Sequence, residues 1–598
     1  MFYNEMFLFQ LSLSALLCDG GKFWHISDLH LDYEYEAGGD ITAFCHHTNN
    51  SYDQSVGPAG NYSCDSPLLL VESALQAMAR HEDSPDFIVW TGDSAPHWRE
   101  PQPPGEKYIT NVTKFVFSKL DQMFPGVPVV PALGNHDMSP PDQFPISVLN
   151  DSHPQYYQTL WSDGAFGEHI NTSQSEETFL KCGYYSKTIL LSGLKMTFLV
   201  LNTNIYYSDY MNDADDEDPC GQLSWLERSL KEADNDTEKV FIVAHVPPGS
   251  FERSPGKLNF NTPNNTFEEI NKKYMEIVTR PGLSRKISAH LYGHLHTDTF
   301  RIFLDGATRS QPVGVAFMAG SVTPVLWVKK IVGVNPTIRL MEYNDDNGIL
   351  LDYSTYFLDL KSQIVQEKSN DTDETGSGRT NAKFLNSSIS KRSDGEKDID
   401  GNESVYDLHW EQLYSARQTY QLQDISAESM FEAYKKMVHQ EGDIFSQYYK
   451  FNTGNNVIGN CDKSCRKNQL CAISNLVLKD LSKCLSNEDG ENNDYFYYHG
   501  SEQNKTMTTE KINGTDPKTT SPQGATDPPV TPSSIVPTGH NENDHSQDSL
   551  DDHVEETQTT TEQLDTDADL SVTKEKIEVN QFRFFSSLNL MYIILDKQ

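Results

Sequence analysis

The chain of 598 residues carries 86 acidic and 47 basic side chains, which gives a formal net charge of −39. This length exceeds what one ordinary hydrophobic core supports, so we expect several structural units. Such an acidic balance excludes a protein that coats nucleic acid, because binding to the phosphate backbone depends on Lys and Arg.

The first 19 residues have the pattern of a targeting segment. The apolar run Met6–Leu17 has the length of the core of a signal peptide and is too short to span a bilayer. Because no Lys or Arg precedes this run, an uncleaved anchor stays as the alternative. We predict a signal peptide over residues 1–19.

The cysteines and the glycosylation sequons agree with a secretory route. Of nine cysteines, Cys18 lies in the predicted signal peptide, which leaves an even number in the mature chain. An even set is typical of disulfides that form in an oxidising compartment. Frequent Asn-x-Ser/Thr sequons also indicate a secreted, extracellular glycoprotein. The sequons lie at Asn49, Asn61, Asn111, Asn150, Asn171, Asn235, Asn264, Asn370, Asn386, Asn402, Asn504 and Asn513.

Residues 20–360 alternate between strand-like and helix-like segments. Short apolar runs indicate buried strands, and longer stretches with apolar residues at helical spacing indicate helices. This alternation predicts an α/β sandwich of two sheets flanked by helices. We expect strands at 23–26, 87–90, 127–132, 196–201, 240–244, 287–291 and 313–318, and helices at 68–81, 113–123, 222–233 and 267–279.

Two segments follow this region. Residues 361–403 are polar and charged, which predicts a surface insertion or linker. Residues 404–485 regain apolar side chains at mostly helical spacing, beginning with Trp410, Leu413 and Tyr414. They predict a small helical C-terminal domain that packs on the preceding region, with a separate partner-binding module as the alternative.

The end of the chain has too few apolar residues for a core. Residues 486–580 are rich in Ser, Thr, Pro and acidic side chains, which predicts a disordered, O-glycosylated stalk. Residues 581–598 form a short apolar terminus interrupted by Arg583 and Asn589. A lipid anchor there, and with it association with a membrane surface, is an alternative to a short amphipathic end.

Five of the predicted strands are each followed at once by polar side chains that can bind metal. Loops at the ends of buried strands can meet at one rim of a sheet. The side chains are carboxylates, imidazoles and one amide, which are ligands of divalent cations. They belong to Asp28, His30, Asp93, Asn135, His245, His294 and His296.

This ligand set suits two cations side by side. Ions about 4 Å apart need an anionic bridge, which Asp93 can supply. Zinc suits the ligand mixture best, with manganese or iron as alternatives. Such a pair predicts a phosphoesterase, because it activates water and stabilises charge on a phosphoryl group. The remaining ligands divide into Asp28, His30 and His296 for one ion and Asn135, His245 and His294 for the other.

The motifs around these ligands resemble those of the calcineurin-like metallophosphoesterase superfamily, and within it the acid sphingomyelinase-like phosphodiesterase branch. The resemblance extends from about Lys22 to Cys484. It implies the metallophosphoesterase fold, a metal-dependent phosphoric diester hydrolase, and the same seven metal ligands. The motifs that carry it are Gly92–His97, Gly134–Asp137, His245–Gly249 and Gly293–His296.

The resemblance also implies two histidines that act beside the metals, His97 and His136. His136 directly follows Asn135 and is placed to donate a proton to the departing oxygen. His97 would assist it or bind a phosphate oxygen, although an ordinary residue at a helix start after Pro96 is the alternative. We expect Asp137 to orient His136 or a ligand histidine through a hydrogen bond.

The resemblance implies disulfides in the C-terminal domain. They are Cys461–Cys465 and Cys471–Cys484, and a zinc knuckle is the alternative. For the other cysteines, Cys45–Cys64 and Cys182–Cys220 are working hypotheses, because the sequence does not determine connectivity.

The metal site predicts the reaction, and the resemblance narrows the substrate. Members of the branch that attack sphingomyelin carry a saposin module ahead of the catalytic domain, and the sequence before Asp28 has no room for one. We therefore expect a monomeric enzyme that uses metal-activated water on small soluble phosphoesters, namely nucleotide di- or triphosphates or CDP-choline. Sphingomyelin hydrolysis to ceramide and phosphocholine is the first alternative. A catalytically inactive binding glycoprotein is the second, and the complete ligand set argues against it.

Overall fold

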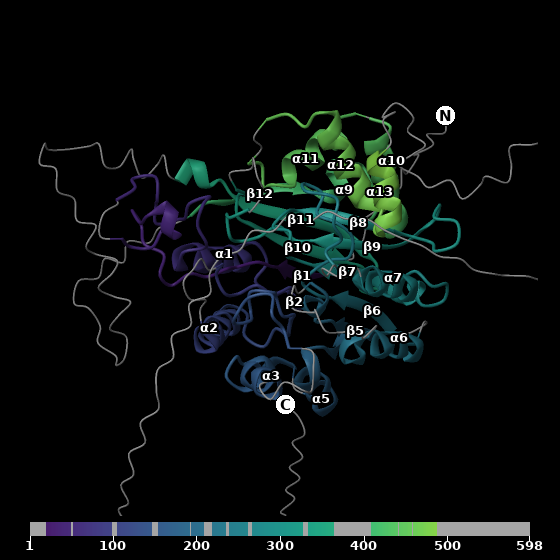
Figure 1. Ribbon diagram of the computed structural model, residues 1–598, viewed down its shortest axis with the longest axis horizontal. Helices are drawn as coiled ribbons and strands as arrows, with labels where there is room; N and C mark the ends of the chain where they lie inside the picture. The colour runs from purple at the N-terminus through teal and green to yellow at the C-terminus, as the bar shows by residue number, and fades with distance from the viewer. Residues whose placement is uncertain are drawn as a thin grey trace, which may run out of the picture. The chain divides into compact units, whose positions relative to one another are not determined.

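The computed structural model (Figure 1) describes the region in which all the predicted metal ligands lie. The predicted signal peptide, most of the polar insertion, the stalk and the apolar terminus lie outside the described residues, as do all sequons except Asn61 and Asn111. The described residues are 20–48, 52–97, 105–145, 153–170, 172–191, 193–207, 218–234, 238–260, 266–326, 333–363, 408–440, 442–456 and 459–486.

Two six-stranded sheets pack face to face and enclose the main core. Aromatic side chains of one sheet meet those of the other: the rings of Phe23 and Phe241 have centroids 6.3 Å apart, and those of Phe87 and Phe198 lie 5.0 Å apart. Such interdigitated inner faces are typical of a sandwich. The predicted α/β sandwich is therefore confirmed.

The first sheet is half parallel and half antiparallel. Its strands β1, β2 and β3 run parallel, and β10, β11 and β12 continue the sheet in antiparallel pairs. In spatial order the strands are β12 (Trp410–Ser415), β11 (Leu350–Leu358), β10 (Thr337–Tyr343), β1 (Gly21–Ile26), β2 (Phe87–Trp90) and β3 (Val129–Pro131).

The second sheet has a parallel centre with an antiparallel strand at each edge. Its central strands are almost wholly buried, which explains why they read as continuous apolar runs. In spatial order the strands are β4 (Tyr185–Leu191), β5 (Leu194–Val200), β6 (Glu238–Val243), β7 (Ile287–Tyr292), β9 (Pro312–Met318) and β8 (Thr299–Leu304).

Helices connect the parallel strands and pack around the sheets (Figure 1). The helix α1 (Leu68–His81) begins after Pro67, and its last turn carries Arg80 and His81, which favour the negative end of the helix dipole. The others in this part of the chain are α2 (Glu106–Met123), α3 (His153–Ser162), α4 (Phe166–Ile170), α5 (Ser173–Cys182), α6 (Gln222–Glu232) and α7 (Thr266–Val278).

The C-terminal region contributes a strand as well as helices. Its helices lie together beside β8 and β9, in green in Figure 1. Trp410, Leu413 and Tyr414 lie on the edge strand β12, so the helical spacing that we expected for these three residues is wrong. The helices are α9 (Ala416–Tyr420), α10 (Ala427–Val438), α11 (Ile444–Phe451), α12 (Lys463–Ser474) and α13 (Leu478–Ser486).

Four disulfides join the eight cysteines in the pairs that we expected. They are Cys45–Cys64, Cys182–Cys220, Cys461–Cys465 and Cys471–Cys484.

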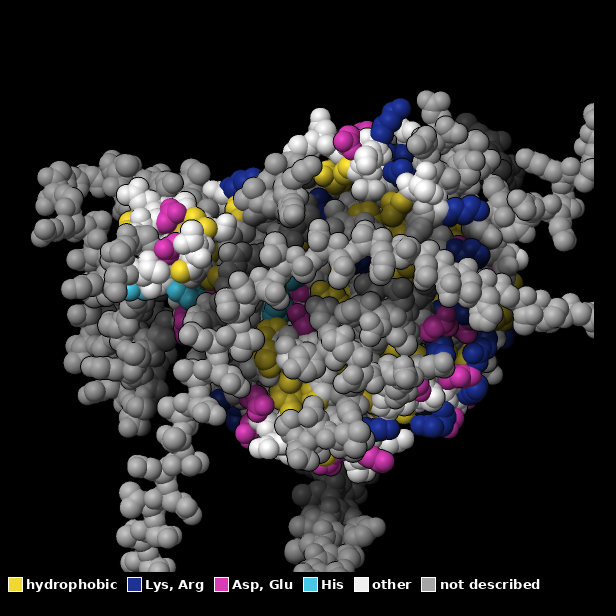
Figure 2. All heavy atoms as spheres, viewed as in Figure 1, with side chains coloured by type: hydrophobic (Ala, Val, Ile, Leu, Met, Phe, Trp, Pro, Cys, Tyr) yellow, Lys and Arg dark blue, Asp and Glu magenta, His cyan; other side chains and the backbone are white. Residues whose placement is uncertain are grey.

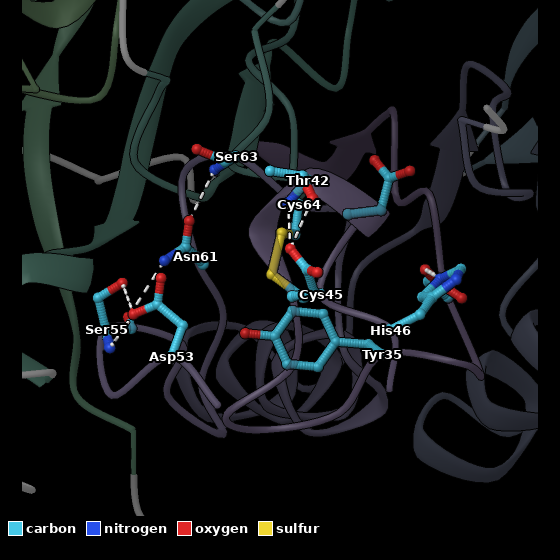
Figure 3. Close-up of a disulfide and its surroundings, with 12 residues drawn as sticks. Tyr35, Thr42, Cys45, His46, Asp53, Ser55, Asn61, Ser63 and Cys64 are labelled. Atoms are coloured by element: carbon cyan, nitrogen blue, oxygen red, sulfur yellow. Dashed lines mark hydrogen bonds and ion pairs between the residues drawn. A yellow bond between two sulfur atoms is a disulfide. The ribbon is translucent and has the colours of Figure 1, made fainter. Parts of the chain in front are cut away.

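The surroundings of the first disulfide involve one of the predicted glycosylation sites. The amide of Asn61 donates to the carbonyl of Ser55 at 3.1 Å, and its oxygen accepts from the N–H of Ser63 at 2.9 Å (Figure 3). Asn61 is only 8% exposed. The side chain of Asn61 is therefore buried and hydrogen-bonded within the folded loop, whereas the side chain of Asn111 on α2 is exposed.

The described surface carries charges of both signs. On the face shown in Figure 2, basic and acidic side chains alternate over the region of α6 and α7, so the described part of that area holds no continuous basic patch. Within the described ranges, none of the helices has both the length and the apolarity needed to cross a membrane.

Candidate metal centre

The loops after five strands meet at one rim of the sandwich. The loop after β1 contacts the loop after β2, because the N–H of Asp28 donates to Gly92 O and the N–H of His30 donates to Asp93 O, both at 3.0 Å. In the second sheet, the N–H of Gly293 donates to His245 O at 3.1 Å. Loops at the carboxyl ends of parallel strands thus bring the predicted ligands together.

Two glycines allow these loops to approach closely. A Cβ atom on Gly134 would lie 2.1 Å from both the backbone nitrogen and Oδ1 of Asp93. A Cβ atom on Gly293 would lie 1.9 Å from the hydroxyl of Ser27, in the other sheet's loop. Glycine is therefore required at both positions for the rim to close.

The backbone at the rim is strained. Five of the predicted ligand residues have positive φ angles, between 41° and 70°. A non-glycine residue held in this left-handed region costs on the order of 1 kcal/mol, and such residues cluster at functional sites. The five residues are Asp28, His30, Asp93, His294 and His296.

One cluster of ligand atoms is compact, and its four residues are buried. Single atoms from Asp28, His30, Asp93 and His296 all lie within 4.8 Å of one another. Two carboxylates and two imidazoles at this separation form a donor set suited to a divalent cation.

Asp93 lies between this cluster and a second one. Its Oδ2 is 3.3 Å from Nε2 of His30 and 3.1 Å from Nε2 of His245. The amide oxygen of Asn135 lies 2.8 Å from Nε2 of His245 and 2.9 Å from Nδ1 of His294. The structure therefore brings the side chains of all seven predicted ligands together at one rim, with Asp93 between Asp28, His30 and His296 on one side and Asn135, His245 and His294 on the other.

Backbone carbonyls orient three of the imidazoles. Nδ1 of His30 lies 2.8 Å from Ala95 O, and Nδ1 of His245 lies 2.6 Å from Thr91 O. Nδ1 of His296 lies 2.6 Å from the carbonyl of residue 325. Because a carbonyl can only accept, each Nδ1 carries the proton, and in the neutral ring Nε2 presents its lone pair to the cluster. Metal-binding histidines are commonly held in this way.

The spacing of two imidazoles also fits a cation. Nε2 of His30 lies 3.2 Å from Nε2 of His296. Burial would lower the pKa of His296, but Asp28 raises it, so its Nε2 attracts a positive charge. Two lone pairs facing each other repel unless such a charge, a proton or a metal ion, lies between them. Two nitrogens bound tetrahedrally to zinc at about 2.0–2.1 Å would be about 3.3 Å apart. The residues present therefore fit a metal.

The carboxylates of the cluster are held in their charged form. Burial alone would raise the pKa of Asp93, but the imidazoles of His245 and His30 hold it well below its usual range. Burial likewise opposes ionisation of Asp28, and His296 lowers its pKa to about 2. Burial lowers the pKa of His30 to about 4 and that of His294 to about 3, so these rings are neutral near pH 7.

His97 lies beside the cluster in a fixed orientation. Its ring stacks on that of His30, with centroids 3.9 Å apart. Its backbone N–H and its Nδ1–H donate to the carboxylate of Asp65 at 2.7 and 2.8 Å. Asp65 is fully buried and also accepts from the hydroxyl of Thr323 at 3.1 Å. This arrangement fixes the tautomer of His97 and leaves Nε2 as the nitrogen that can exchange a proton with a ligand.

His136 is anchored through its backbone. Its N–H donates to Oδ1 of Asp93 at 2.8 Å, and its ring lies 4.4 Å from that of His97 between centroids. Its Nδ1 is buried and has no hydrogen-bond partner among the described residues. The imidazole thus packs edge-on against the rings of His97 and His30 beside the cluster, while its Nδ1 has no hydrogen-bond partner in the described part of the chain.

Asp137 has a different role from the one that we expected. Its carboxylate accepts the N–H groups of Asp93 at 3.0 Å, Ser94 at 2.9 Å and Gly134 at 2.8 Å, rather than an imidazole. A carboxylate can satisfy several neighbouring N–H donors at once, which here joins the loops after β2 and β3. Asp137 therefore shapes the loop that carries Asp93.

Sequence reasoning missed two residues that support side chains of the site. Asp142 accepts from the amide nitrogen of Asn135 at 2.8 Å, which turns the amide oxygen toward His245 and His294. Asp65 holds His97. Neither belongs to a motif: Asp142 lies in a turn, and Asp65 follows Cys64 in the loop before α1.

Comparisons with known proteins agree with this geometry. Residues 21–298 match the family model for calcineurin-like phosphoesterases, and residues 397–491 match that for the acid sphingomyelin phosphodiesterase C-terminal region. The chain is 33% identical to acid sphingomyelinase-like phosphodiesterase 3b of Mus musculus, over 78% of this chain and 90% of that protein.

Two further relatives have a similar extent of identity. The chain is 31% identical to the cyclic GMP-AMP phosphodiesterase SMPDL3A of Homo sapiens, over 78% of this chain and 90% of that protein. It is 31% identical to sphingomyelinase phosphodiesterase C of Dictyostelium discoideum, over 78% of this chain and 92% of that protein.

Proposed function

The chain belongs to the calcineurin-like phosphoesterase family, in its acid sphingomyelinase-like branch, and is a metal-dependent phosphodiesterase; from this premise we propose that it hydrolyses soluble nucleotide phosphoesters at the seven predicted metal ligands, which together we call the rim cluster. The observation that carries the site assignment is the convergence of ligand atoms from both sheets on Asp93. The metals are two divalent ions, with zinc as our first choice because of the four imidazoles. Asp28, His30 and His296 would hold one ion, Asn135, His245 and His294 would hold the other, and Asp93 would contribute to both sites.

Side chains beside the metal ligands donate the proton to the departing oxygen and bind the phosphate oxygens. When bound, a pair of divalent cations supplies an activated water and neutralises charge on the phosphoryl oxygens. His136 donates the proton that the departing oxygen needs, because its ring lies beside the cluster and its Nδ1 has no hydrogen-bond partner within the described ranges. His97, oriented by Asp65, binds a phosphate oxygen or assists His136.

Nucleotides suit the surroundings of the second cluster. The half-buried ring of Tyr207 contacts the imidazole of His294 edge-on, with centroids 4.6 Å apart. An aromatic ring next to a metal ligand can pack against a planar base. The relative named as a cyclic GMP-AMP phosphodiesterase supports phosphodiesters of nucleotides as substrates. The proposed class therefore includes cyclic dinucleotides, nucleotide di- and triphosphates and CDP-choline.

Sphingomyelin is the second candidate. The Dictyostelium relative named as a sphingomyelinase phosphodiesterase favours it, at the same level of identity. In either case the substrate is a small phosphoester. Four disulfides in the described chain support an extracellular enzyme.

A substrate panel separates the two candidates. Purified protein is incubated with cyclic GMP-AMP, ATP, CDP-choline and sphingomyelin in detergent micelles, and the products are separated chromatographically. We expect kcat/KM for at least one soluble nucleotide to exceed that for sphingomyelin tenfold or more. The Asp93→Ala variant serves as the blank, because it removes the shared ligand. Turnover of sphingomyelin alone would contradict the proposed substrate class.

A further inference from the structure

The C-terminal region makes hydrogen bonds directly to the loop that carries His294 and His296. Thr297 and Asp298 complete this loop before β8 begins, and both are buried. The N–H of Asp298 donates to the carbonyl of Asn452 at 3.0 Å. Asn452 directly follows α11 and is 1% exposed. A residue more than 150 positions away in the sequence therefore supports the backbone next to a proposed ligand.

The side chain of Asn452 joins two ligand-bearing loops. Its amide nitrogen donates to the carbonyl of Asp298 at 3.1 Å and to the carboxylate of Glu252 at 3.0 Å. Glu252 lies in the loop after His245, is fully buried, and accepts from the hydroxyl of Thr297 at 2.7 Å. One amide of the C-terminal region thus satisfies polar groups in the loops after β6 and β7.

A second C-terminal side chain holds the same loop from the other side. The hydroxyl of Tyr414, on β12, donates to the carboxylate of Asp298 at 2.8 Å. The same carboxylate accepts from Arg339 at 2.6 Å and from the hydroxyl of Thr355 at 2.7 Å. Tyr414 and Asp298 are both buried, so removal of the hydroxyl would leave a buried acceptor with fewer partners.

The turn after Asn452 also supports the hydrogen-bond acceptor of His296. The carbonyl of Gly454 accepts from the amide of Asn335 at 2.8 Å. The neighbouring Val334 donates its N–H to the carbonyl of Pro324 at 2.9 Å. Residue 325, whose carbonyl accepts from Nδ1 of His296, directly follows Pro324. Both supports of His296, its own loop and its acceptor, therefore connect to residues 452–454.

We propose that Asn452 and Tyr414 are positioning residues of the metal centre, so that the C-terminal region forms part of the frame of the site. This inference rests on the proposed function, because it needs the rim cluster to bind metal. Ligand side chains must be held within about 0.5 Å of their productive positions. Loss of either hydrogen-bonding group would let the loop with His294 and His296 shift and would weaken metal binding.

The test compares two buried asparagines that both join the C-terminal region to the rest of the fold. Asn452→Leu removes the side-chain hydrogen bonds to Glu252 and to the carbonyl of Asp298, and it leaves the backbone hydrogen bond from Asp298 to residue 452 in place. Asn271→Leu removes a hydrogen bond of the same kind, from the amide of Asn271 on α7 to the carbonyl of Leu476 at 2.8 Å, and Asn271 is equally buried. Full-length protein is stripped with a chelator, and zinc affinity is measured by competition with a chromophoric chelator.

We expect Asn452→Leu to weaken zinc binding by about 10- to 100-fold, the usual effect of losing a group that orients metal ligands. The Asn271→Leu variant should retain wild-type affinity, even where both metal-free proteins lose similar thermal stability. Unchanged affinity in Asn452→Leu, or an equal loss in both variants, would overturn the inference.

A milder substitution covers the case in which Asn452→Leu does not fold. Tyr414→Phe removes the hydroxyl that donates to the carboxylate of Asp298, and we expect several-fold weaker zinc binding. Wild-type affinity in this folded variant would also overturn the inference. Wild-type protein that binds no zinc would contradict the proposed function itself, whereas tight binding by wild type and by both positioning variants would contradict only the role of the C-terminal region.

Discussion

His136 differs from the other histidines at the rim in how it is held. The three rings of His30, His245 and His296 donate through Nδ1 to backbone carbonyls, whereas Nδ1 of His136 has no partner among the described residues. A ring that gives and receives a proton in each turnover benefits from such freedom. This contrast distinguishes the proposed acid from the proposed ligands.

The His136→Ala variant should retain its metal and lose activity. The backbone N–H that contacts Asp93 survives the substitution, so the ligand geometry is preserved. We expect kcat to fall on the order of a hundredfold or more for nucleotide substrates. The loss should be much smaller for bis(p-nitrophenyl) phosphate, because nitrophenolate leaves without a proton. Equal losses with both substrates would contradict the role of His136 as an acid.

Asp65 is expected to act only through His97. Asp65→Asn keeps the shape of the side chain but removes the charged acceptor of Nδ1–H, so the orientation and tautomer of His97 are no longer fixed. We expect about a 10- to 100-fold loss of kcat/KM with metal content unchanged. In a His97→Ala background the same substitution should have little further effect. A full additional loss there would show that Asp65 works by another route.

The two kinds of site residue differ in how far the sequence predicts them. The proposed ligands directly follow apolar runs, and the ends of parallel strands share a rim. Local sequence patterns were therefore sufficient to predict that these residues lie close together. Asp65 contacts His97 across 32 positions of the chain, and nothing near it in sequence indicates that contact. Asp137 was recognised as polar and close to His136, but only the structure shows that its partners are N–H groups.

At the scale of elements, the strands and helices that carry the site were predicted better than those at the periphery. The helix at 68–81 has the bounds that we predicted. The helix that we predicted at 113–123 begins at Glu106. The prediction missed its start because the first turn is largely exposed and lacks a strong apolar pattern. The strand β12 was interpreted as helix because a β-bulge between Thr355 and Tyr356 interrupts its pairing with β11, so its burial does not alternate strictly.

The stability that the loop between β1 and α1 gives to the fold should depend on pH through the protonation of His46. Burial would lower the pKa of His46, but its contact with the buried carboxylate of Asp32, at 2.7 Å, raises it. A raised pKa in the folded state means that the stabilisation is complete below the unfolded value of about 6.5 and is lost as the pH rises through the folded value. We expect His46→Gln to be less stable than wild type by about 1 kcal/mol at pH 5.5.

The same comparison at pH 9 should show little difference, as measured by denaturant unfolding with the disulfides intact. His47 provides a matched control, because its side chain is 70% exposed and faces Glu36 at 3.3 Å. His47→Gln should change stability by much less at either pH. A His46→Gln deficit that stays constant or grows with rising pH would contradict the ion-pair account.

At the scale of the whole molecule, the proposed ligands come from both sheets. Asp28, His30, Asp93 and Asn135 follow strands of the first sheet, and the remaining three histidines follow strands of the second. Metal binding at the rim would therefore join the two halves of the sandwich, and the C-terminal region reaches the same rim through Asn452 and Tyr414. The sequence predicted this sandwich, but the contacts between the C-terminal region and the rim are long-range and leave no local pattern.

The metal content of the purified protein, measured by elemental mass spectrometry against protein concentration, tests the central claim most directly. We predict two divalent ions per chain in the wild-type protein, chiefly zinc, and loss of both ions and of turnover in Asp93→Ala, because Asp93 is the shared ligand. Wild-type protein with no stoichiometric metal, or Asp93→Ala protein that keeps two ions and its activity, would contradict the account.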